Sequence, residues 1–487
     1  MIEVLSVTSE IYPLIKTGGL ADVAGALPGA LSESGVTMRT LVPGYPAVTG
    51  KMTGGREVAR LDDLFGVSAR LIAGRVEGLD LIVLDAPSLY DRPGNPYMGP
   101  EGWDWPDNWM RFAALSWVAS ELGLGLVEGY RPQVIHAHDW QAGLVPAYVK
   151  FGPSSNIKTV MTVHNMAFQG TFGAQVFPQL RLPPHAFSVD GVEYYGGVGY
   201  LKAGVECADV VTTVSPTYAA EIRTPAFGMG LEGLLNNRSD TVYGVLNGID
   251  MDAWNPATDP ALAQTYTAGT MQGRLVNKRA VQEAFGLDPL DGPLFAVVSR
   301  LTWQKGIDLL AANIDMLVAS GAQLAVLGSG DAELENAVRS AAMAHPGRVG
   351  LVTGYNEKLS HLIQGGADVM MVPSRFEPCG LTQLYALRYG CVPLVCRVGG
   401  LNDTVIDANV AAIQAEVATG VQFAPPSEAA LADAIRRVLA LYADEKSWKK
   451  MQRRGMKSDV SWETSAGRYA ELYASLIGYT TDDSQDD

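Results

Sequence analysis

The loop from Pro373 to Gln383 carries residue types whose spacing suits the binding of an anion. Pro373 and Pro378 restrict its backbone, because proline fixes φ and biases the residue before it away from helix. Gly380 then frees the backbone just before a run that predicts a helix. Helix starts leave amides unpaired, and these amides together with the helix dipole bind anions. With the acid Glu377 three residues before Gly380, the loop predicts a site for a phosphorylated sugar.

Two cations, Arg300 and Lys305, follow a second apolar strand and precede another helical run. Cations spaced in this way can clamp a diphosphate and neutralise the charge that develops on its leaving oxygen. The alternative is a solvated loop with surface cations. The loop around Glu377 favours the clamp, because it supplies a partner segment for the same ligand.

Lys16, Gly18 and Gly19 lie in a loop after the first predicted strand. Paired glycines allow the backbone to approach a phosphate or a sugar closely. A simple strand-to-helix turn is the alternative interpretation. The chain has neither a Walker pattern nor a G-x-G-x-x-G motif at a helix start, which argues against a P-loop or a dinucleotide site.

The segment His136-Ala137-His138-Asp139 could begin a metal site, because imidazole and carboxylate ligands alternate at a strand end. Strand alternation, however, points His136 and His138 to one side and Asp139 to the other. No second cluster is formed by the remaining histidines, which are His164, His185, His345 and His361. We therefore expect no metal, and we expect Asp139 and Trp140 to form the polar and apolar walls of a sugar pocket.

Two further positions allow more than one role. His164, which follows a strand and precedes Asn165, could bind a sugar hydroxyl or could be a hydrogen-bonded structural histidine. Glu377 could be a general acid, a nucleophile, a hydroxyl anchor or a helix cap. A nucleophile normally needs a second carboxylate nearby, and the sequence places none, so we favour the anchor. Cys379 lies at a helix start, where the pKa of a thiol falls, but no base stands near it, so packing is the expected role.

The elements that position these residues alternate between strand and helix, most regularly from Phe295 onward. Such alternation predicts βαβ units and an open parallel sheet in each half of the chain. Residues 56–85 alternate as several short strands and are interpreted as an inserted hairpin region, and a further helix is expected near 401–408. The principal strands are expected at 4–8, 37–42, 134–137, 159–163, 210–214, 242–246, 294–299, 322–327, 348–352, 368–372 and 392–395.

The candidate residues all follow the carboxyl ends of predicted strands, where open parallel sheets bind ligands. The loops with Lys16, Asp139 and His164 belong to the first half of the chain, and those with Arg300 and Glu377 belong to the second. Two sheets that face one another with these edges would enclose a cleft. The expected fold class is therefore α/β, with two open-sheet domains.

Composition excludes several classes of protein. A chain of 487 residues is too long for one ordinary core, and a net charge of −16 argues against nucleic acid as a partner. The four cysteines, which include Cys391 and Cys396, form no C-x-x-C pair, and free thiols fit a reducing compartment. The chain shows neither a signal-peptide layout nor a membrane-spanning run, so we expect a cytoplasmic protein that does not bind membranes. The tail from Thr480 to Asp487 is polar and acidic and is expected to be disordered.

With these residues in view, the sequence resembles bacterial glycogen synthase and plant starch synthase, retaining glycosyltransferase family 5, over nearly its full length. The segments that carry the resemblance are Lys16 to Asp22, His136 to Trp140, Val163-His164-Asn165, Asn247 to Asp250, Ser299-Arg300-Leu301 with Lys305-Gly306, and Pro373 to Gln383. The glycine-rich segment from Tyr194 to Gly199 and the bulky Trp303 depart from the family pattern.

The resemblance implies a GT-B fold, in which two Rossmann-like domains flank a deep cleft. The expected domains are residues 1–246, joined by a C-terminal helix at about 457–480, and residues 247–456. The resemblance also implies transfer of glucose, with retention, from ADP-glucose to the non-reducing end of an α-1,4-glucan such as glycogen. No metal or other cofactor is implied, and any assembly is expected to be a homo-oligomer.

The resemblance assigns roles to individual residues. Arg300 and Lys305 would hold the diphosphate, and Glu377 would bind glucose hydroxyls. The sugar site would be lined by Asp139, His164 and Asn247. Further substrate contacts would come from Lys16, Gly18, Gly19, Asp22, Trp140, Asn165, Tyr355, Cys379, Gly380, Leu381 and Thr382. The alternatives that remain are a sucrose synthase-like transferase, a glycogen phosphorylase and a catalytically silent glucan-binding protein.

Overall fold

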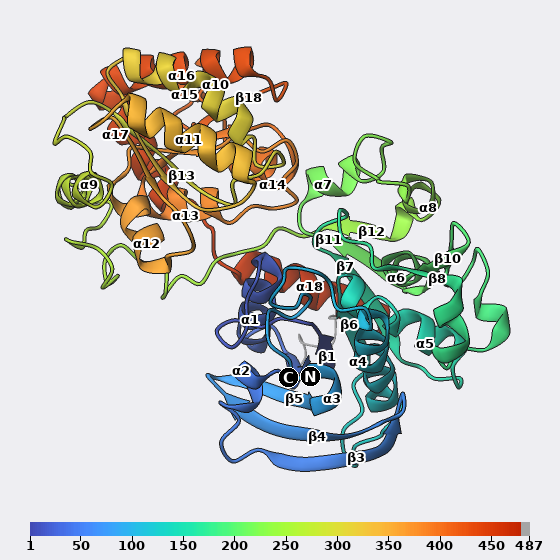
Figure 1. The fold of residues 1–487 in the computed structure, drawn as a ribbon. Coiled ribbons are helices and arrows are strands. Elements are labelled where there is room, and N and C mark those ends of the chain that lie inside the picture. Colours follow the sequence, from blue (N-terminus) through green and yellow to red (C-terminus); the bar gives the residue numbers. More distant parts are fainter. Residues whose placement is uncertain (479–487) are drawn as a thin grey trace. The chain divides into compact units, whose positions relative to one another are not determined.

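The chain forms two compact units in the computed structural model, which describes residues 1–478 (Figure 1). Unit 1 contains Met1–Asn247 and the segment that starts at Trp462, and unit 2 contains Gly248–Ser461. The tail from Thr480 to Asp487, predicted to be disordered, lies outside the described residues. Within residues 1–478, no helix combines the length and the apolar character that crossing a membrane requires.

Unit 1 is built on a nine-stranded sheet with the strand order β12-β11-β7-β6-β1-β2-β5-β4-β3. All its neighbouring strands from β12 to β5 pair in parallel, and the last two pairs are antiparallel. The strands are β1 (Ile2–Val7), β2 (Val36–Pro43), β3 (Arg56–Leu64), β4 (Val67–Val76), β5 (Leu79–Asp85), β6 (Val134–His138), β7 (Lys158–Val163), β11 (Val210–Thr213) and β12 (Val242–Gly244).

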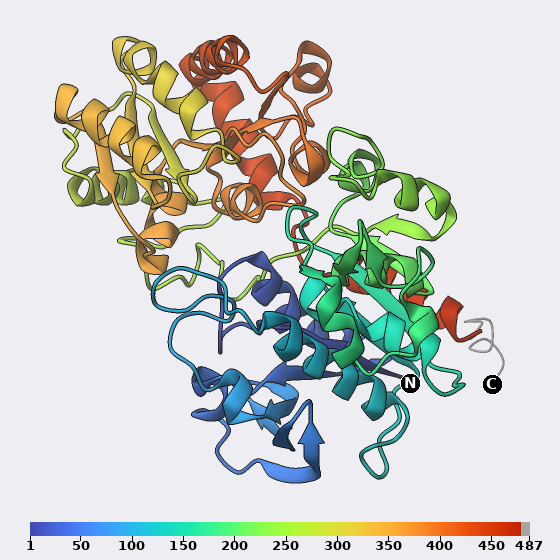
Figure 2. The same ribbon diagram turned by 45° about the vertical axis from the view of Figure 1, so that its right-hand side comes forward.

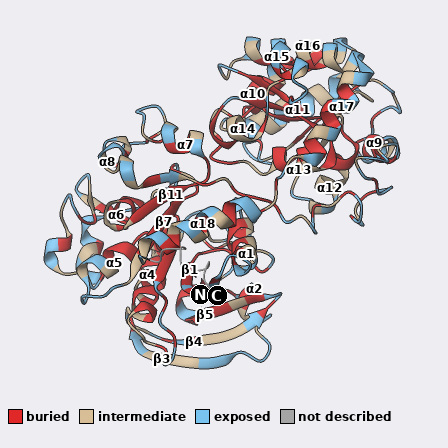
Figure 3. Cartoon of the chain, turned by 180° about the vertical axis from the view of Figure 1, so that it is seen from behind, coloured by how far each residue is buried: buried red, intermediate tan, exposed pale blue. Residues whose placement is uncertain are grey.

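The central strands of this sheet are buried, whereas β3 and β4 at its edge are partly exposed (Figure 3). Parallel strands that are covered on both faces are buried along their whole length. Every residue of β6, including its two histidines, is buried in this way. The covering helices are α1 (Gly19–Ser32), α4 (Asn108–Gly123), α5 (Val145–Phe151), α6 (Tyr200–Cys207) and α18 (Glu463–Leu476), with the shorter helices α2 (Pro46–Thr49), α3 (Pro87–Tyr90), α7 (Pro216–Glu221) and α8 (Glu232–Asn237).

The predicted strands and hairpins at residues 56–85 are present, since β3–β4 and β4–β5 pair antiparallel, but they do not form a separate insertion. β3, β4 and β5 have nine, ten and seven residues, and they continue the main sheet because β5 pairs in parallel with β2. The physical reason lies in β5, whose residues from Leu81 to Leu84 are fully buried and therefore require cover on both faces.

The helix α18 returns to unit 1 and lies beside α1 (Figures 1 and 2). Its residues Tyr469 and Tyr473, together with Trp462 just before it, pack with Ile2 and Leu27 in one buried cluster. The last turns of the described chain therefore complete the core of the first unit.

A second, smaller sheet of unit 1 lies within residues 165–199. Its strands β8 (Thr171–Gly173), β10 (Gly197–Gly199) and β9 (Glu193–Tyr194) pair in that order. The glycine-rich departure near residue 196 is therefore a tight hairpin, in which Tyr195 and Gly196 both adopt positive φ.

Unit 2 contains a six-stranded parallel sheet with the order β15-β14-β13-β16-β17-β18. The strands are β13 (Leu294–Val298), β14 (Gln323–Leu327), β15 (Val349–Val352), β16 (Val369–Val372), β17 (Val392–Cys396) and β18 (Val421–Phe423). The helices are α9 (Gly273–Ala284), α10 (Ile307–Ala319), α11 (Ala332–Ala344), α12 (Glu357–Gly366), α13 (Thr382–Tyr389), α14 (Gly399–Thr404), α15 (Val410–Gln414), α16 (Glu428–Ala443) and α17 (Glu445–Lys457). The predicted α/β class with two open-sheet domains is confirmed.

One helix of unit 2 is shorter than predicted. The helix expected near 401–408 ends at Thr404, because the chain after it becomes extended and Asp407 forms a parallel β-bridge with Gly420. This difference does not alter the loops that follow β13 and β16, which carry the candidate residues of unit 2.

Candidate active site

The predicted acid of unit 2, Glu377, is buried and paired with a cation. Its Oε2 accepts hydrogen bonds from Lys305 Nζ at 2.6 Å and from Ser374 Oγ at 2.9 Å. The side chains of Lys305 and Glu377 are 18% and 10% exposed, so solvent screens this ion pair only weakly. The structure therefore brings together two residues that the sequence places 72 positions apart.

Backbone contacts hold the loops of Lys305 and Glu377 against one another. The backbone carbonyl of Gln304 accepts a hydrogen bond from the amide of Arg375. The side-chain amide of Gln304 donates a hydrogen bond to the carbonyl of Phe376. Gly306 has a φ of 68°, and a Cβ at this position would lie 2.1 Å from the carbonyl oxygen of Pro373. A side chain at Gly306 would push the two loops apart, which explains the glycine after Lys305.

Trp303, a departure from the family pattern, has a structural role in this region. The guanidinium of Arg375 lies over the Trp303 ring at 4.3 Å from its centroid and forms a bidentate ion pair with Asp308. The hydrogen bond with Arg375 lowers the pKa of Asp308. This arrangement fixes Arg375 at the back of the Glu377 loop by a cation–π contact and a charge-assisted fork.

The remainder of the loop turns at Gly380, which has a φ of 75°. Gln383 Nε2 donates to the carbonyl oxygens of Cys379 at 3.0 Å and Gly380 at 2.8 Å, which closes the turn at the start of α13. Cys379 is buried and forms no disulfide within residues 1–478, which is consistent with its predicted packing role. Leu381 is the N-cap residue and Thr382 the first residue of α13, so their amides lie at the helix start.

The other two predicted residues of unit 2 are exposed. Arg300 follows β13, and its side chain has no ion pair within residues 1–478. Tyr355 follows β15 and is 77% exposed, and its hydroxyl donates a hydrogen bond to the carboxylate of Glu357. Of the two predicted diphosphate cations, Lys305 is therefore already engaged by Glu377, whereas Arg300 retains its full capacity for an anion.

In unit 1, the loop with Lys16 and its glycines is organised by Glu10, a residue that the sequence analysis missed. Glu10 is 2% exposed, and its carboxylate accepts hydrogen bonds from the amides of Thr17 and Gly18 and from the hydroxyls of Thr17 and Tyr97. No motif marks Glu10 in the sequence; only its place after β1, the strand that precedes the glycine loop, could have singled it out.

In this loop the cation is paired with an acid, whereas the two glycines are exposed. Lys16 Nζ pairs with Asp22 Oδ1 at 2.7 Å, so these two predicted residues meet each other. Gly18 is the N-cap residue of α1 and Gly19 its first residue, and both are exposed. A Cβ at Gly18 would meet no atom within 4 Å, so the space beside it is open to a ligand.

Asp139 and His164 lie at adjacent strand ends and contact one another. Asp139 Oδ1 accepts a hydrogen bond from the His164 amide at 2.7 Å, and Asp139 has a positive φ of 57°. Burial raises the pKa of Asp139 to about 7; the amides of His164 and Asn165 oppose this rise, and the nearby Glu10 carboxylate adds to it. The carboxyl of Asp139 therefore changes its charge near neutral pH.

The three histidines of this region hydrogen-bond to neighbouring side chains. His136 lies 2.7 Å from the Tyr473 hydroxyl of α18 and 2.5 Å from Thr162 Oγ1, which engages both of its ring nitrogens. His138 Nδ1 lies 3.0 Å from His164 Nε2, and burial lowers the pKa of all three rings. Among the described residues, no group of three or more His, Cys, Asp or Glu is arranged to hold a metal ion.

Three predicted residues of unit 1 occupy distinct surroundings. Trp140 packs in an aromatic cluster with Phe112 and Phe172, at ring-centroid distances of 4.9 and 6.0 Å. Its ring therefore contacts other buried side chains of the core. Asn165 accepts a hydrogen bond from the Ala167 amide and shapes the turn after His164. Asn247 is 9% exposed, and its Oδ1 is buried without a hydrogen-bond partner in the described part of the chain. An acceptor left in this way suits a ligand hydroxyl.

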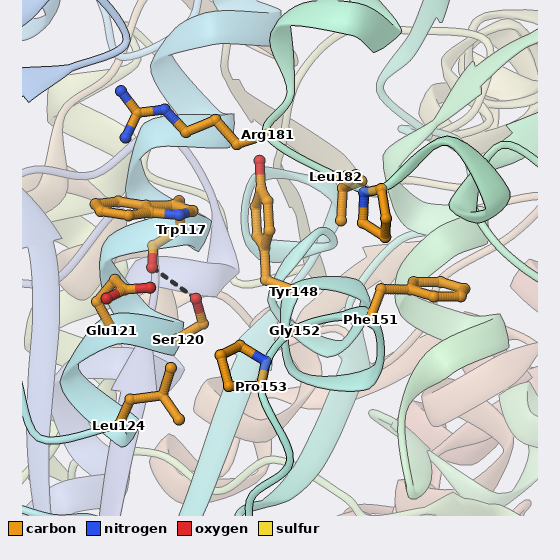
Figure 4. Close-up of a pocket in the computed structure, with 11 residues that line it drawn as sticks. Trp117, Ser120, Glu121, Leu124, Tyr148, Phe151, Gly152, Pro153, Arg181 and Leu182 are labelled. Atoms are coloured by element: carbon orange, nitrogen blue, oxygen red, sulfur yellow. Dashed lines mark hydrogen bonds between the residues drawn. The ribbon is translucent and has the colours of Figure 1, made fainter.

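One partly open pocket of unit 1 is lined by none of these residues (Figure 4). It has a volume of about 100 Å³ and is lined by Trp117 and Glu121 of α4, Tyr148 and Phe151 of α5, and Arg181. No predicted site residue, all of which the structure describes, lines this pocket. Ligand pockets usually have volumes of about 300–1,000 Å³, so it is too small for a nucleotide sugar.

Comparison with known proteins identifies the family. The model of the starch synthase catalytic domain matches residues 3–237, and that of glycosyl transferases group 1 matches residues 279–455. A glycogen synthase from Rhizobium etli is 58% identical over 477 residues, which cover 98% of this chain and 99% of that protein. A glycogen synthase from Mesorhizobium japonicum is 58% identical over 475 residues, with the same coverage.

Solved structures agree with this result. The catalytic domain of starch synthase IV from Arabidopsis thaliana, bound to ADP and acarbose, has a TM-score of 0.87 and 32% identity, and the match covers 98% of this chain and 99% of that chain. Sucrose-phosphate synthase from Thermosynechococcus elongatus, at 20% identity and a TM-score of 0.60 over 99% of this chain and 100% of that chain, shares the fold. The predicted GT-B class and the predicted hexosyltransferase class are thereby confirmed. The chain belongs to the glycogen synthase and starch synthase family of glycosyltransferases.

Proposed function

We propose that the protein transfers glucose, with retention, from ADP-glucose to the non-reducing end of an α-1,4-glucan. The observation that carries this proposal is the cluster of Lys305, Glu377 and Ser374, beside the amides at the start of α13. It combines a fixed acid for sugar hydroxyls with groups that bind phosphate. The family assignment supports the same activity.

Lys305 and Arg300 bind the diphosphate of the donor in this proposal. The ammonium of Lys305 has three N–H donors, so it holds Glu377 with one and keeps others for phosphate oxygens. Arg300 adds a planar fork that matches a phosphate and stabilises the charge developing on the leaving oxygen. The start of α13, with Gly380, Leu381 and Thr382, contributes amides and the helix dipole.

Glu377 anchors glucose hydroxyls rather than attacking the sugar. Its ion pair with Lys305 makes it a weak nucleophile and fixes its orientation. Tyr355, exposed on the loop after β15, offers a ring face to the adenine, and the buried Cys379 supports the loop backbone.

Residues of unit 1 bind the sugars in this proposal. Asp139, His164 and Asn247 supply hydrogen-bond acceptors and donors to hydroxyls, with Asn165 and Trp140 shaping the surrounding loop. A further loop of unit 1 approaches the substrate in this proposal, and its contacts come from Lys16, Gly18, Gly19 and Asp22. The neutral state of the His164 ring, which follows from its burial, suits hydroxyl binding better than phosphate binding.

Retention follows from a reaction on one face of the sugar. The bond between the glucose C1 and the phosphate oxygen breaks while a bond from C1 to the acceptor O4 forms on the same side. The proton of the acceptor hydroxyl passes to the departing phosphate oxygen, so ADP leaves and no second carboxylate is required. Closure around the donor would exclude water and suppress hydrolysis.

A panel of donors and acceptors tests the proposal. Purified protein is incubated with glycogen and labelled glucose in ADP-glucose, UDP-glucose or sucrose, and transfer and the anomeric configuration of the product are measured. We expect transfer from ADP-glucose into α-1,4 linkages, and its strong loss in Glu377→Gln. Absence of glucose transfer from ADP-glucose to glycogen would refute the proposal and favour another donor or a silent glucan-binding protein.

A further inference from the structure

The helix α17 of unit 2 carries an unusual concentration of positive charge for an acidic protein. The whole chain has a net charge of −16. The cations on this one helix are Lys446, Lys449, Lys450, Arg453, Arg454 and Lys457, against the single acid Glu445. Lys446, Lys450 and Arg454 are spaced at four-residue intervals and therefore share one face of the helix.

This face of α17 lines a cavity of about 330 Å³ that no predicted site residue touches. Lys446, Lys450 and Arg454 form its charged side, with Ser447 beside them. Ile413 and Leu441 contribute apolar wall. The volume is within the range of small-molecule sites and far exceeds that of a single ion.

One carboxylate, that of Glu416, occupies the charged side of the cavity. It forms an ion pair with Lys450 and lies 3.7 Å from Arg454. The hydrogen bond from Lys450 lowers the pKa of Glu416, and the charges of Lys450, Arg454 and Lys446 add to this effect. All three cations thus act on a single anionic group.

Glu416 holds this position at a conformational cost. Its φ is 58°, in the left-handed region at the end of α15, where glycine or asparagine is usual. The other acid of the cavity, Asp444, is engaged as the cap of α17, since it accepts hydrogen bonds from the amide and the hydroxyl of Ser447. Three cations are therefore gathered around one carboxylate, and the same donors can hold another anion in its place.

We propose that this cavity binds a small phosphate-bearing molecule, whose phosphoryl oxygens take the place of the Glu416 carboxylate between Lys446, Lys450 and Arg454. A phosphoryl group carries up to two charges and several acceptor oxygens, so it satisfies more of the three cations than one carboxylate does. The room beside the cations accommodates the uncharged part of a sugar phosphate. The site is separate from the Lys305–Glu377 cluster and does not depend on the proposed transferase activity.

Binding of inorganic phosphate and of glucose 6-phosphate to the full-length protein, measured by isothermal titration calorimetry, tests the proposal. We expect saturable binding that weakens about ten-fold or more in Lys450→Met, because one charge-assisted contact is lost. Glu416→Gln should bind several-fold more tightly, because the competing carboxylate is gone. Lys449→Met is the matched control and should leave the affinity unchanged, since Lys449 lies on the same helix, pairs with Glu445 and is not part of the cavity lining.

The two ligands distinguish the source of the phosphoryl group. Tighter binding of glucose 6-phosphate would identify a sugar phosphate, and equal binding would identify the phosphoryl group alone as the recognised unit. The proposal is overturned if neither ligand binds, or if Lys449→Met weakens binding as much as Lys450→Met does. It is also overturned if the observed binding survives Lys450→Met but disappears in Arg300→Ala, because the phosphate would then occupy the other cluster.

Discussion

Two buried carboxylates, Glu10 in unit 1 and Glu377 in unit 2, each organise a loop of the candidate site, but different donors stabilise them. Within residues 1–478, Glu10 accepts hydrogen bonds from uncharged donors, which are backbone amides and hydroxyls. Glu377 instead pairs with the ammonium of Lys305 and accepts one hydrogen bond from the hydroxyl of Ser374. One loop is therefore tied by neutral hydrogen bonds and the other by an ion pair.

This difference separates the chemistry of the two loops. Around Glu377, the ion pair neutralises the carboxylate, so the charge of Arg300 stays available for a diphosphate. Around Glu10, the carboxylate is not neutralised by a cation, and Lys16 is paired with Asp22. We therefore expect the loop of unit 1 to favour sugar hydroxyls over phosphates, and the loop of unit 2 to favour the diphosphate.

Lys305→Met breaks the ion pair and should have the largest effect on stability. The substitution leaves Glu377, whose side chain is 10% exposed, as a buried charge with only the Ser374 hydroxyl as a partner. Removal of one member of a buried pair costs about 3–5 kcal/mol, which should appear as faster hydrogen exchange of the amides in β13 and β16.

The double variant Lys305→Met/Glu377→Gln is the matched control for this prediction. It removes both charges, so most of the lost protection should return while glucose transfer stays low. Equal exchange in Lys305→Met and in the wild type would show that the ion pair does not hold the two loops together.

Arg300→Ala should affect catalysis rather than stability. The exposed guanidinium has no ion pair in the described part of the chain, so its loss leaves the fold intact. Removal of one donor to a developing oxyanion costs about 2.7–4 kcal/mol, or about a hundred- to a thousand-fold in kcat. Arg339→Ala, which removes an exposed arginine paired with Glu335, is the control and should retain full kcat. Normal turnover in a folded Arg300→Ala protein would remove Arg300 from the site.

The sequence predicts the unit 2 half of this comparison well and the unit 1 half poorly. Lys305 and Glu377 could be placed together because both lie in loops after regular apolar strands, and neighbouring parallel strands end at one edge of a sheet. The alternation of β13 to β18 with helices is local information, which explains why these elements were predicted closely.

The hydrogen-bond partners of Glu10 could not be predicted, because the fold rather than the spacing in the sequence brings them together. Tyr97 lies 87 residues away, in a segment dense in proline and glycine that carries no periodic signal. The same reason hides the contact of His136 with Tyr473, which are 337 residues apart. The left-handed backbone of Asp139, and the burial that raises its pKa, likewise depend on strands that meet only in the folded protein.

The carboxylate of Glu10, which no cation neutralises within residues 1–478, contributes to the raised pKa of Asp139. The titration of Asp139 therefore tests how unit 1 responds to buried negative charge. The folded protein holds the proton of Asp139 up to about pH 7, whereas an unperturbed carboxyl loses it near 3.8. The folded state therefore binds more protons between these values, and stability falls as pH rises through them. Between pH 5 and pH 8, this one group should lower the free energy of unfolding of unit 1 by about 2–3 kcal/mol.

Denaturant unfolding at both pH values measures this effect. Asp139→Asn, which cannot ionise, should lose this part of the pH dependence and be more stable than the wild type at pH 8. Its glucose transfer should nevertheless fall, because the carboxylate no longer binds a hydroxyl. Identical pH profiles for the two proteins would show that Asp139 titrates as an ordinary exposed acid.

Glu10→Gln should have the smallest effect, because the donors to Glu10 are neutral. The glutamine carbonyl can accept from the amides of Thr17 and Gly18, and its NH₂ group can donate to the hydroxyls of Thr17 and Tyr97, which can rotate to accept. The expected loss of stability is about 1 kcal/mol. Glu10→Ala cannot satisfy these groups, so hydrogen exchange in the segment around Thr17 should be fast in Glu10→Ala and near wild type in Glu10→Gln. If Glu10→Gln exposed this segment as much as Glu10→Ala does, the negative charge itself, and not the neutral hydrogen bonds, would hold the loop of unit 1.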